Sequence, residues 1–322
     1  MKVFVTGGSG FVGRNLIAAL VARGDKVVAL ARSPAAADTV KALGAMPQAG
    51  DLGDVADMRA GMAGAELVFH CAAKVEDWGD MAEFQRVNVQ GTANVIDAAR
   101  AAGVRRLAHV GTEAVLVDGT PIRNADETRP RASRPVGPYP TSKGQAEALA
   151  LAANGNGLEV VVARPRFIWG KGDTAVLPQI VAVMRKKQFA WFGGGRYLTS
   201  TCHVRNVCEG LLLAAERGKP GEIYFLTDGA PVEFRQFLTA MAATQGVDPG
   251  SREVPRGLIY AIAGLCELLW PLLRLRGRPP VTRSAVLLIG EEVTVNDAKA
   301  RRELGYRGLV SREAGLAEMA AH

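Results

Sequence analysis

A glycine-rich turn between a strand and a helix constrains this chain more than any other feature. The segment TGGSGFVG spans residues 6–13; an apolar run of strand length precedes it at 3–5, and apolar residues at helical spacing follow over 16–21. Glycines in such a turn let the backbone approach a pyrophosphate, which then lies at the positive end of the helix. The pattern predicts a dinucleotide site, with a glycine-rich turn that binds nothing as the alternative, and its three glycines are Gly7, Gly10 and Gly13.

Short apolar segments and helical segments alternate through the first half of the chain. Segments of strand length lie at 27–30, 67–70, 107–110 and 160–163, and a helix is expected over 91–102. This alternation predicts an α/β fold with a parallel, doubly wound (Rossmann) sheet. Ligands of such sheets bind at the carboxyl ends of the strands, which is where the glycine-rich turn lies.

The charge of the chain does not point to nucleic acid as a partner. The net charge is +7, but the basic residues are scattered, and no aromatic residues interleave with the one arginine cluster, at 274, 276, 278 and 283. The N-terminus begins with a strand-like segment rather than a signal peptide, so we expect a cytoplasmic protein. Without metal-ligand spacing or a disulfide framework, free buried thiols are expected at Cys71, Cys202, Cys208 and Cys266.

The segment PYPTSK, residues 138–143, sets a phenol and an ammonium four residues apart. If a helix begins near Tyr139, this residue and Lys143 share one helix face. A nearby lysine favours the phenolate and lowers the phenol pKa from its usual value of about 10, which suits proton exchange with an alcohol or a ketone. A surface pair at a helix start is the alternative.

Taken together, the motifs resemble those of the extended short-chain dehydrogenases/reductases, in the 3β-hydroxysteroid dehydrogenase-like branch. The chain is similar there to sterol-4-carboxylate 3-dehydrogenases and 2-alkyl-3-oxoalkanoate reductases. The resemblance covers nearly the whole length. Besides the glycine spacing and the Tyr-x-x-x-Lys pair, it rests on GDL at 50–52, FHCAAKV at 69–75, VNVQGT at 87–92, RPRFIWGKGD at 164–173 and CHVRNV at 202–207.

The resemblance implies a role for each matching residue. Tyr139 would be the proton shuttle, and Lys143 would hold the nicotinamide ribose and lower the tyrosine pKa. The family's serine falls on Thr112, in HVGTEAV; a threonine keeps the hydroxyl, and a cap at the strand end is the alternative role. The remaining residues that the resemblance implies around the cofactor are Phe11, Val12, Asp51, Leu52, Ala72, Ala73, Lys74 and Pro165.

The second strand predicts the choice between the two nicotinamide cofactors. Binding of NAD usually requires an acidic residue at the end of this strand, but KVVALARS has Arg32 near that position and Asp25 lies too early. An arginine there can pair with a 2′-phosphate, so NADP is favoured slightly over NAD. A solvated arginine at the strand end is the alternative.

The resemblance also implies how the chain divides. Residues 1–165 would form the dinucleotide-binding domain, to which 198–227 return, and 166–197 and 228–322 would form a smaller, mostly helical substrate lobe. Within it, 192–201 matches the segment that lines the substrate pocket. Asn206 and His203 lie in the stretch that joins the lobes, and a structural histidine is favoured there over a second acid or base.

The most apolar part of the chain is 256–280, which Glu267 and Pro271 interrupt too strongly for a membrane span. It would form helices over an apolar pocket, the favoured interpretation, or lie on a membrane surface with the arginines at the headgroups. Both interpretations predict a sterol, an isoprenoid or a long-chain β-keto acid as substrate.

The sequence therefore predicts an NAD(P)-dependent enzyme that transfers a hydride between nicotinamide and a secondary alcohol or ketone, without a metal. Two alternatives use the same fold: a sugar-nucleotide epimerase or dehydratase with tightly bound NAD, and a dinucleotide-binding sensor without catalysis. The complete Thr-Tyr-Lys set argues against the sensor. The oligomeric state stays open, a homodimer included.

Overall fold

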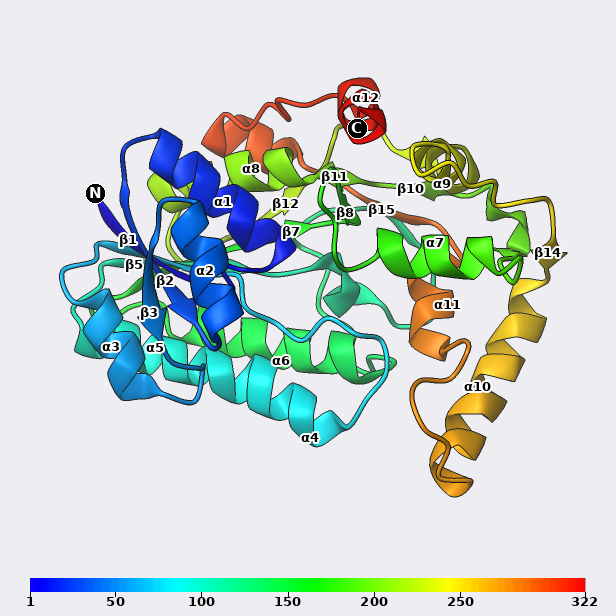
Figure 1. The fold of residues 1–322 in the computed structure, drawn as a ribbon, viewed down its shortest axis with the longest axis horizontal. Coiled ribbons are helices and arrows are strands. Elements are labelled where there is room, and N and C mark those ends of the chain that lie inside the picture. Colours follow the sequence, from blue (N-terminus) through cyan, green and yellow to red (C-terminus); the bar gives the residue numbers. More distant parts are fainter. Residues whose placement is uncertain (322) are drawn as a thin grey trace.

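The computed structural model describes residues 1–321, and a seven-stranded parallel sheet lies at its centre (Figure 1). The strand order is β12-β7-β5-β4-β1-β2-β3, so the order reverses between β1 and β4. Every neighbouring pair in this sheet is parallel. The strands are β1 (Lys2–Thr6), β2 (Lys26–Ala31), β3 (Met46–Ala49), β4 (Leu67–His70), β5 (Arg106–Val110), β7 (Glu159–Pro165) and β12 (Ile223–Leu226).

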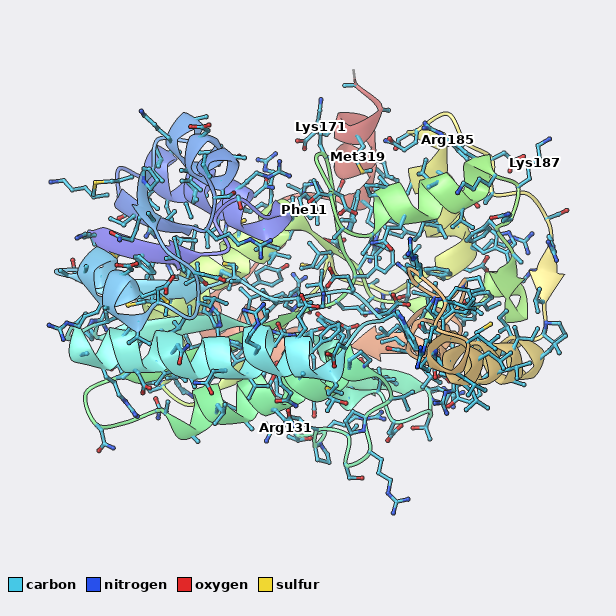
Figure 2. The ribbon with its side chains drawn as sticks, turned by 60° about the horizontal axis from the view of Figure 1, so that its bottom comes forward. Phe11, Arg131, Lys171, Arg185, Lys187 and Met319 are labelled. Atoms are coloured by element: carbon cyan, nitrogen blue, oxygen red, sulfur yellow. The ribbon has the colours of Figure 1, made fainter. Side chains whose placement is uncertain are left out.

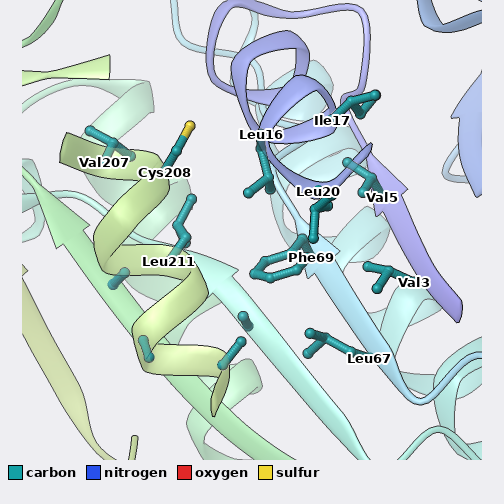
Figure 3. Close-up of a cluster of buried hydrophobic side chains, with 14 of the residues drawn as sticks. Val3, Val5, Leu16, Ile17, Leu20, Leu67, Phe69, Val207, Cys208 and Leu211 are labelled. Atoms are coloured by element: carbon teal, nitrogen blue, oxygen red, sulfur yellow. The ribbon is translucent and has the colours of Figure 1, made fainter. Parts of the chain in front are cut away.

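Helices cover both faces of the sheet because its strands are apolar on both sides. In β1, Val3 and Val5 belong to one core cluster, whereas Phe4 points into the other. The first face is covered by α1 (Phe11–Ala22), α2 (Pro34–Ala42) and α8 (Val204–Arg217); Figure 3 shows side chains of α1 and α8 packed above β1 and β4. The second face is covered by α3 (Val55–Met62), α5 (Gly91–Ala101) and α6 (Pro138–Ala152).

The α/β fold with its parallel, doubly wound sheet is confirmed. The five strand segments expected from the sequence lie within β1, β2, β4, β5 and β7, and the helix expected over 91–102 is α5. Two strands were not expected, β3 and β12. β3 reads MPQA, and only half-buried or exposed side chains line it, so it carries no apolar run to recognise.

The rest of the chain forms smaller units beside the large sheet. A four-stranded sheet has the order β13-β10-β15-β6, and two strand pairs are β8–β11 and β9–β14. The strands of the four-stranded sheet are β6 (Ile122–Ala125), β10 (Leu198–Thr199), β13 (Val232–Glu233) and β15 (Val293–Val295). The strands of the two pairs are β8 (Ile168–Trp169), β11 (Cys202–His203), β9 (Trp191–Phe192) and β14 (Glu253–Val254). The remaining helices are α4 (Met81–Phe84), α7 (Leu177–Arg185), α9 (Phe234–Ala243), α10 (Arg256–Leu272), α11 (Arg283–Ile289) and α12 (Arg312–Ala320).

The four cysteines are free thiols; Cys202 and Cys208 are buried, and Cys71 and Cys266 are partly buried. Within residues 1–321, no helix combines the length and the apolarity that a membrane crossing requires.

Candidate active site

The carboxyl ends of β1 and β4 meet where the strand order of the sheet reverses. Thr6 and His70, the last residues of these strands, are partners in the parallel register, and the Thr6 Oγ1 lies 2.7 Å from the His70 Nδ1. The next residues approach still more closely, because a Cβ atom on Gly7 would lie 2.6 Å from the backbone nitrogen of Ala72. The glycine-rich turn and the segment after β4 are thus packed side by side, at the point where doubly wound sheets bind their ligands.

The three glycines of the turn differ in what requires them. Gly7 has a positive φ of 70°, and a Cβ atom on Gly13 would lie 2.1 Å from the Gly7 carbonyl oxygen, so the fold itself needs both. Gly10 is the N-cap of α1, with φ −79° and ψ 173°, which any residue adopts, and a Cβ atom would meet only the Gly7 oxygen, at 3.3 Å.

Gly10 is exposed, and the fold alone does not demand a glycine there. A residue without a side chain at a helix N-terminus lets a pyrophosphate come close to the backbone N–H groups, whose dipoles attract its negative charge. Phe11 and Val12 follow in the first turn of α1; Phe11 is buried and Val12 packs against the core, so both hold this helix end in place.

Tyr139 lies in the first turn of α6, which begins at Pro138, as the sequence predicted. The preceding Gly137 turns the chain with a φ of 96°. Burial raises the pKa of the Tyr139 phenol to about 12, against the lowering effect of a hydrogen bond with Thr112. The phenol is therefore protonated at neutral pH and stands beside the threonine that the sequence singled out.

Lys143 points toward the end of β5 rather than toward the phenol. Its Nζ donates a hydrogen bond to the Val110 carbonyl oxygen at 2.7 Å and lies 3.5 Å from the buried His109 Nε2. Burial lowers the pKa of the Lys143 ammonium to about 8. This differs from the expectation that Lys143 lowers the tyrosine pKa: the ammonium satisfies its hydrogen bonds at the strand end, and burial dominates the pKa of Tyr139.

Thr112 follows β5 and caps a short 3-10 helix at Glu113–Leu116. Its Oγ1 accepts a hydrogen bond from the Ala114 backbone nitrogen at 3.2 Å and donates one to the Glu113 Oε2 at 3.0 Å. The structure thus shows Thr112 as the N-cap of this short helix, just after the end of β5.

A buried ion pair fixes the carboxylate that accepts from Thr112. Glu113 Oε1 lies 2.8 Å from the Arg166 Nη1, and both side chains are buried. Arg166 also donates to the Thr199 hydroxyl and the Leu288 carbonyl oxygen, so it ties the Thr112 segment to the small sheet. The sequence did not reveal this pair directly, but it contains a signal for it. A glutamate directly after Thr112 and an arginine at the end of an apolar strand are both expected to be buried, and burying either charge without a partner costs free energy.

A second buried pair lies on the other side of Pro165. Arg164 donates from Nε to the Glu147 Oε2 at 2.7 Å and from Nη2 to the Glu147 Oε1 at 2.5 Å. Glu147 belongs to α6, one turn beyond Lys143. Pro165 itself is buried at the end of β7, at the same sheet edge as Thr112.

The residues expected at the adenine end follow β2 and β3. The Arg32 side chain is exposed and makes no hydrogen bond or ion pair with any other residue of 1–321. Asp51 accepts from the Leu52 backbone nitrogen at 2.7 Å, and the Asn94 amide donates to the Leu52 carbonyl oxygen at 2.8 Å. The side chain of Leu52 is buried against Gly91 of α5, so this loop is held firmly at the sheet edge.

The segment Ala72, Ala73 and Lys74 runs on from β4 and is held by a residue whose role the sequence did not reveal. Asn88 accepts from the Lys74 backbone nitrogen at 2.7 Å and donates to the Lys74 carbonyl oxygen at 3.0 Å, and also to the Ser142 hydroxyl at 2.9 Å. Asn88 is in a π-helical turn, Gln85–Gln90, of a kind often found at functional sites. It couples this segment to the helix that carries Tyr139 and Lys143.

His203 and Asn206 lie at the N-terminal end of α8, and neither is hydrogen-bonded to Tyr139. The His203 Nδ1 accepts from the Arg205 backbone nitrogen at 3.3 Å, and its ring packs edge-on against Trp169, with ring centroids 4.9 Å apart. Asn206 bonds to Asp228 at 2.7 Å and to both backbone groups of Val310 at 2.8 Å. The bonds of Asn206 are those of a structural residue, whereas the buried His203 Nε2 has no hydrogen-bond partner within residues 1–321.

A surface hollow of about 400 Å³ lies between α7 and α12, and none of the predicted site residues line it. Its residues Lys171, Arg185 and Met319 are at the top of Figure 2, whereas Arg131, which pairs with Glu147 of α6, is at the bottom.

Comparisons with known proteins show the family to which the chain belongs. The model of the 3-beta hydroxysteroid dehydrogenase/isomerase family matches residues 4–256. The chain is 55% identical to a 4-hydroxy-2-methyl-3-oxo-4-farnesyl-3,4-dihydroquinoline-1-oxide ketoreductase of Stigmatella aurantiaca, over 98% of this chain and 95% of that one. It is 36% identical to a 2-alkyl-3-oxoalkanoate reductase of Stenotrophomonas maltophilia, over 100% and 99%.

Among solved structures, the crystal structure of gox2253 is similar with a TM-score of 0.78 and 29% identity, over 98% of this chain and 97% of that one. The likeness therefore extends through both the large sheet and the smaller units beside it.

Proposed function

Because the chain belongs to the 3-beta hydroxysteroid dehydrogenase/isomerase family, within the extended short-chain dehydrogenases/reductases, we propose that it reduces a ketone of an apolar substrate with NADPH. It is an NAD(P)-dependent oxidoreductase that acts on hydroxyl or keto groups. The direction, the cofactor preference and the substrate class are the new parts of this proposal.

Two relatives named as a ketoreductase and a reductase support the direction, and the protonation state of Tyr139 is compatible with it. A ketone that accepts a hydride needs a proton on its oxygen, and the pKa of about 12 keeps that proton on Tyr139 at neutral pH. Reduction is therefore the direction for which the free enzyme is already in the correct protonation state.

Three side chains share the work. When bound, the nicotinamide supplies the hydride. Tyr139 donates the proton to the substrate oxygen, and the Thr112 hydroxyl, which influences the pKa of the phenol, stabilises the charge that develops on that oxygen. Lys143, with a pKa near 8, is an ammonium at neutral pH, and it would bind a ribose hydroxyl of the cofactor in place of the Val110 carbonyl oxygen.

The glycine-rich turn would hold the pyrophosphate over Gly10, and the segments after β3 and β4 would contact the nucleotide through Asp51, Leu52, Ala72, Ala73 and Lys74. Arg32 is exposed directly after β2 and, within residues 1–321, is paired with no acid, so it is free to pair with the 2′-phosphate of NADP. This supports NADP over NAD.

The names of two relatives support the substrate class. One relative is named for a farnesylated quinoline oxide and the other for 2-alkyl-3-oxoalkanoates, both of which carry long apolar groups. We infer that 166–197 and 228–322 form the substrate-binding lobe of this chain. A ketone beside a prenyl or alkyl chain is the substrate class that fits.

The test is a panel of ketones offered to the purified protein with NADPH and, separately, NADH. It includes prenylated quinolones and 2-alkyl-3-oxoalkanoates, and Tyr139→Phe serves as the inactive control. Consumption of NADPH that depends on the ketone supports the proposal. Release of tightly bound NAD on denaturation, with no net cofactor consumption on any ketone, would instead indicate a sugar-nucleotide epimerase or dehydratase.

A further inference from the structure

Helix α10 exposes an apolar stripe that the rest of the chain does not cover. Of its seventeen residues, Ala263 alone is classed as buried. One side packs on the protein, through Ile259 and Tyr260. The other side, here called the leucine face, has side chains between 40% and 70% exposed and consists of Leu258, Ile262, Leu265, Leu268 and Leu272.

The spacing of these five residues, in steps of three and four, places them on one side of the helix over four turns. Figure 1 shows α10 extending away from the large sheet at the lower right of the view. Soluble surfaces rarely display so many large apolar side chains in one contiguous patch unless the patch has a partner.

The charged residues of α10 are turned away from the leucine face. Arg256, at its start, pairs with Glu291 at 2.6 Å, and Glu267, three turns further on, pairs with Arg283 at 2.7 Å. The charge of Glu267 therefore lies outside the leucine face, and Pro271, the other interruption of the apolar segment, is uncharged. The face can enter an apolar medium without burying an ion.

Free positive charge lies just beyond the end of the leucine face. Arg274 and Arg276 are exposed and form no ion pair within residues 1–321, while Arg278 pairs with Asp77 at 2.8 Å. Exposed Leu273 and Leu275 alternate with these arginines. An apolar helix face with cations at its edge complements an anionic lipid surface, where leucines enter the acyl boundary and arginines meet the headgroups.

We propose that the leucine face of α10 docks this protein on an anionic lipid bilayer, with Arg274 and Arg276 at the headgroups. The docking surface is distinct from the glycine-rich turn and from the residues around Tyr139. It does not depend on which ketone the enzyme reduces.

The docking helix is connected to the catalytic helix through one intervening element. Ala263 of α10 packs with Val281 and Val286, and α11 reaches the turn before α6, where a Cβ atom on Gly137 would lie 2.8 Å from the Ser284 Cβ. Tyr139 is two residues further on. If the proposed function holds, an apolar substrate dissolved in the bilayer would reach the site from the docked side.

The experiment is co-sedimentation of the full-length protein with vesicles, in the absence of substrate and cofactor. Vesicles of phosphatidylcholine alone are compared with vesicles of equal parts phosphatidylcholine and phosphatidylglycerol. We expect the protein to bind the anionic vesicles, and added salt to weaken the binding. Absence of binding to anionic vesicles at low salt overturns the proposal, whatever the enzymatic activity.

Two double variants separate the contributions. Leu265→Ser/Leu268→Ser removes two apolar contacts and should lower the partition coefficient about 100-fold. Arg274→Gln/Arg276→Gln should lower the partition coefficient on anionic vesicles about 30-fold, because each arginine contributes about fivefold. Binding to the uncharged vesicles should not change.

The matched control is Leu149→Ser/Leu309→Ser, which changes two leucines of similar exposure outside α10. It should bind as the wild type does. All four leucines are exposed, so the melting temperatures should stay the same, and a soluble ketone should be turned over equally. Vesicle binding that is undiminished in Leu265→Ser/Leu268→Ser contradicts the proposal. The proposal is also contradicted if the wild type does not bind vesicles but forms a dimer in solution that this variant dissociates.

Discussion

Replacing Gly10 with valine should remove the cofactor and leave the protein folded. The Gly10 backbone is extended, and a Cβ atom there meets only the Gly7 oxygen at 3.3 Å, so the cost to folding is that of a poorer N-cap, about 1 kcal/mol. The branched side chain would occupy the space that we assign to the pyrophosphate. Loss of two charge-assisted hydrogen bonds, each about 1.5–3 kcal/mol, predicts that the dissociation constant rises about 100-fold or more.

The matched control is Gly13→Ala, whose Cβ atom would lie 2.1 Å from the Gly7 oxygen. It should lower the free energy of unfolding by at least about 1–3 kcal/mol, because the turn must shift to make room. Urea denaturation measures stability, and quenching of protein fluorescence by NADPH measures binding. If Gly10→Val binds NADPH as tightly as wild type, or unfolds as easily as Gly13→Ala, the assignment of the space over Gly10 is wrong.

Four further predictions concern single side chains. Tyr139→Phe should lower kcat at least about 100-fold and leave NADPH binding intact, since only the transferable proton is lost; undiminished turnover would refute its role. Arg32→Asp should reduce the preference for NADP over NAD at least about tenfold in kcat/KM at one ionic strength, and equal losses with both cofactors would show a merely solvated arginine. The Lys143 ammonium loses its proton as pH rises through about 8, so kcat/KM should fall above that pH; a profile that stays flat to strongly alkaline pH contradicts this. Glu113→Gln should lower the free energy of unfolding by about 3–5 kcal/mol because Arg166 stays buried and charged, whereas Glu113→Gln/Arg166→Met should recover part of it; an unchanged urea midpoint in the single variant would show that the pair is not buried in solution.

The sequence predicted the parts of this molecule that depend on local patterns. The glycine spacing, the apolar strands and the helix that begins at Tyr139 are each written within a few consecutive residues, and the structure has all of them. The family and the type of reaction followed from these patterns together with the motifs. The strand β3 was missed because its residues carry no such pattern.

What the sequence could not provide depends on contacts between distant residues. Lys143 was expected beside the phenol because four residues make one helical turn, but the Val110 carbonyl at the end of β5 attracts its ammonium. The pairing of Glu113 with Arg166 joins residues 53 apart, and no spacing rule predicts it. The direction of the leucine face likewise depends on which side of α10 the rest of the protein covers.

The two buried ion pairs beside Pro165 have a consequence for how such a site can evolve. Arg164 and Arg166 each require a glutamate from a different element, Glu147 or Glu113. An ancestor that changed one partner first would pass through a form destabilised by about 3–5 kcal/mol, which is a large part of the 5–15 kcal/mol that typically holds a domain together. These four positions should therefore change in pairs or stay as they are along a lineage, whereas exposed and unpaired Arg32 can drift by single steps.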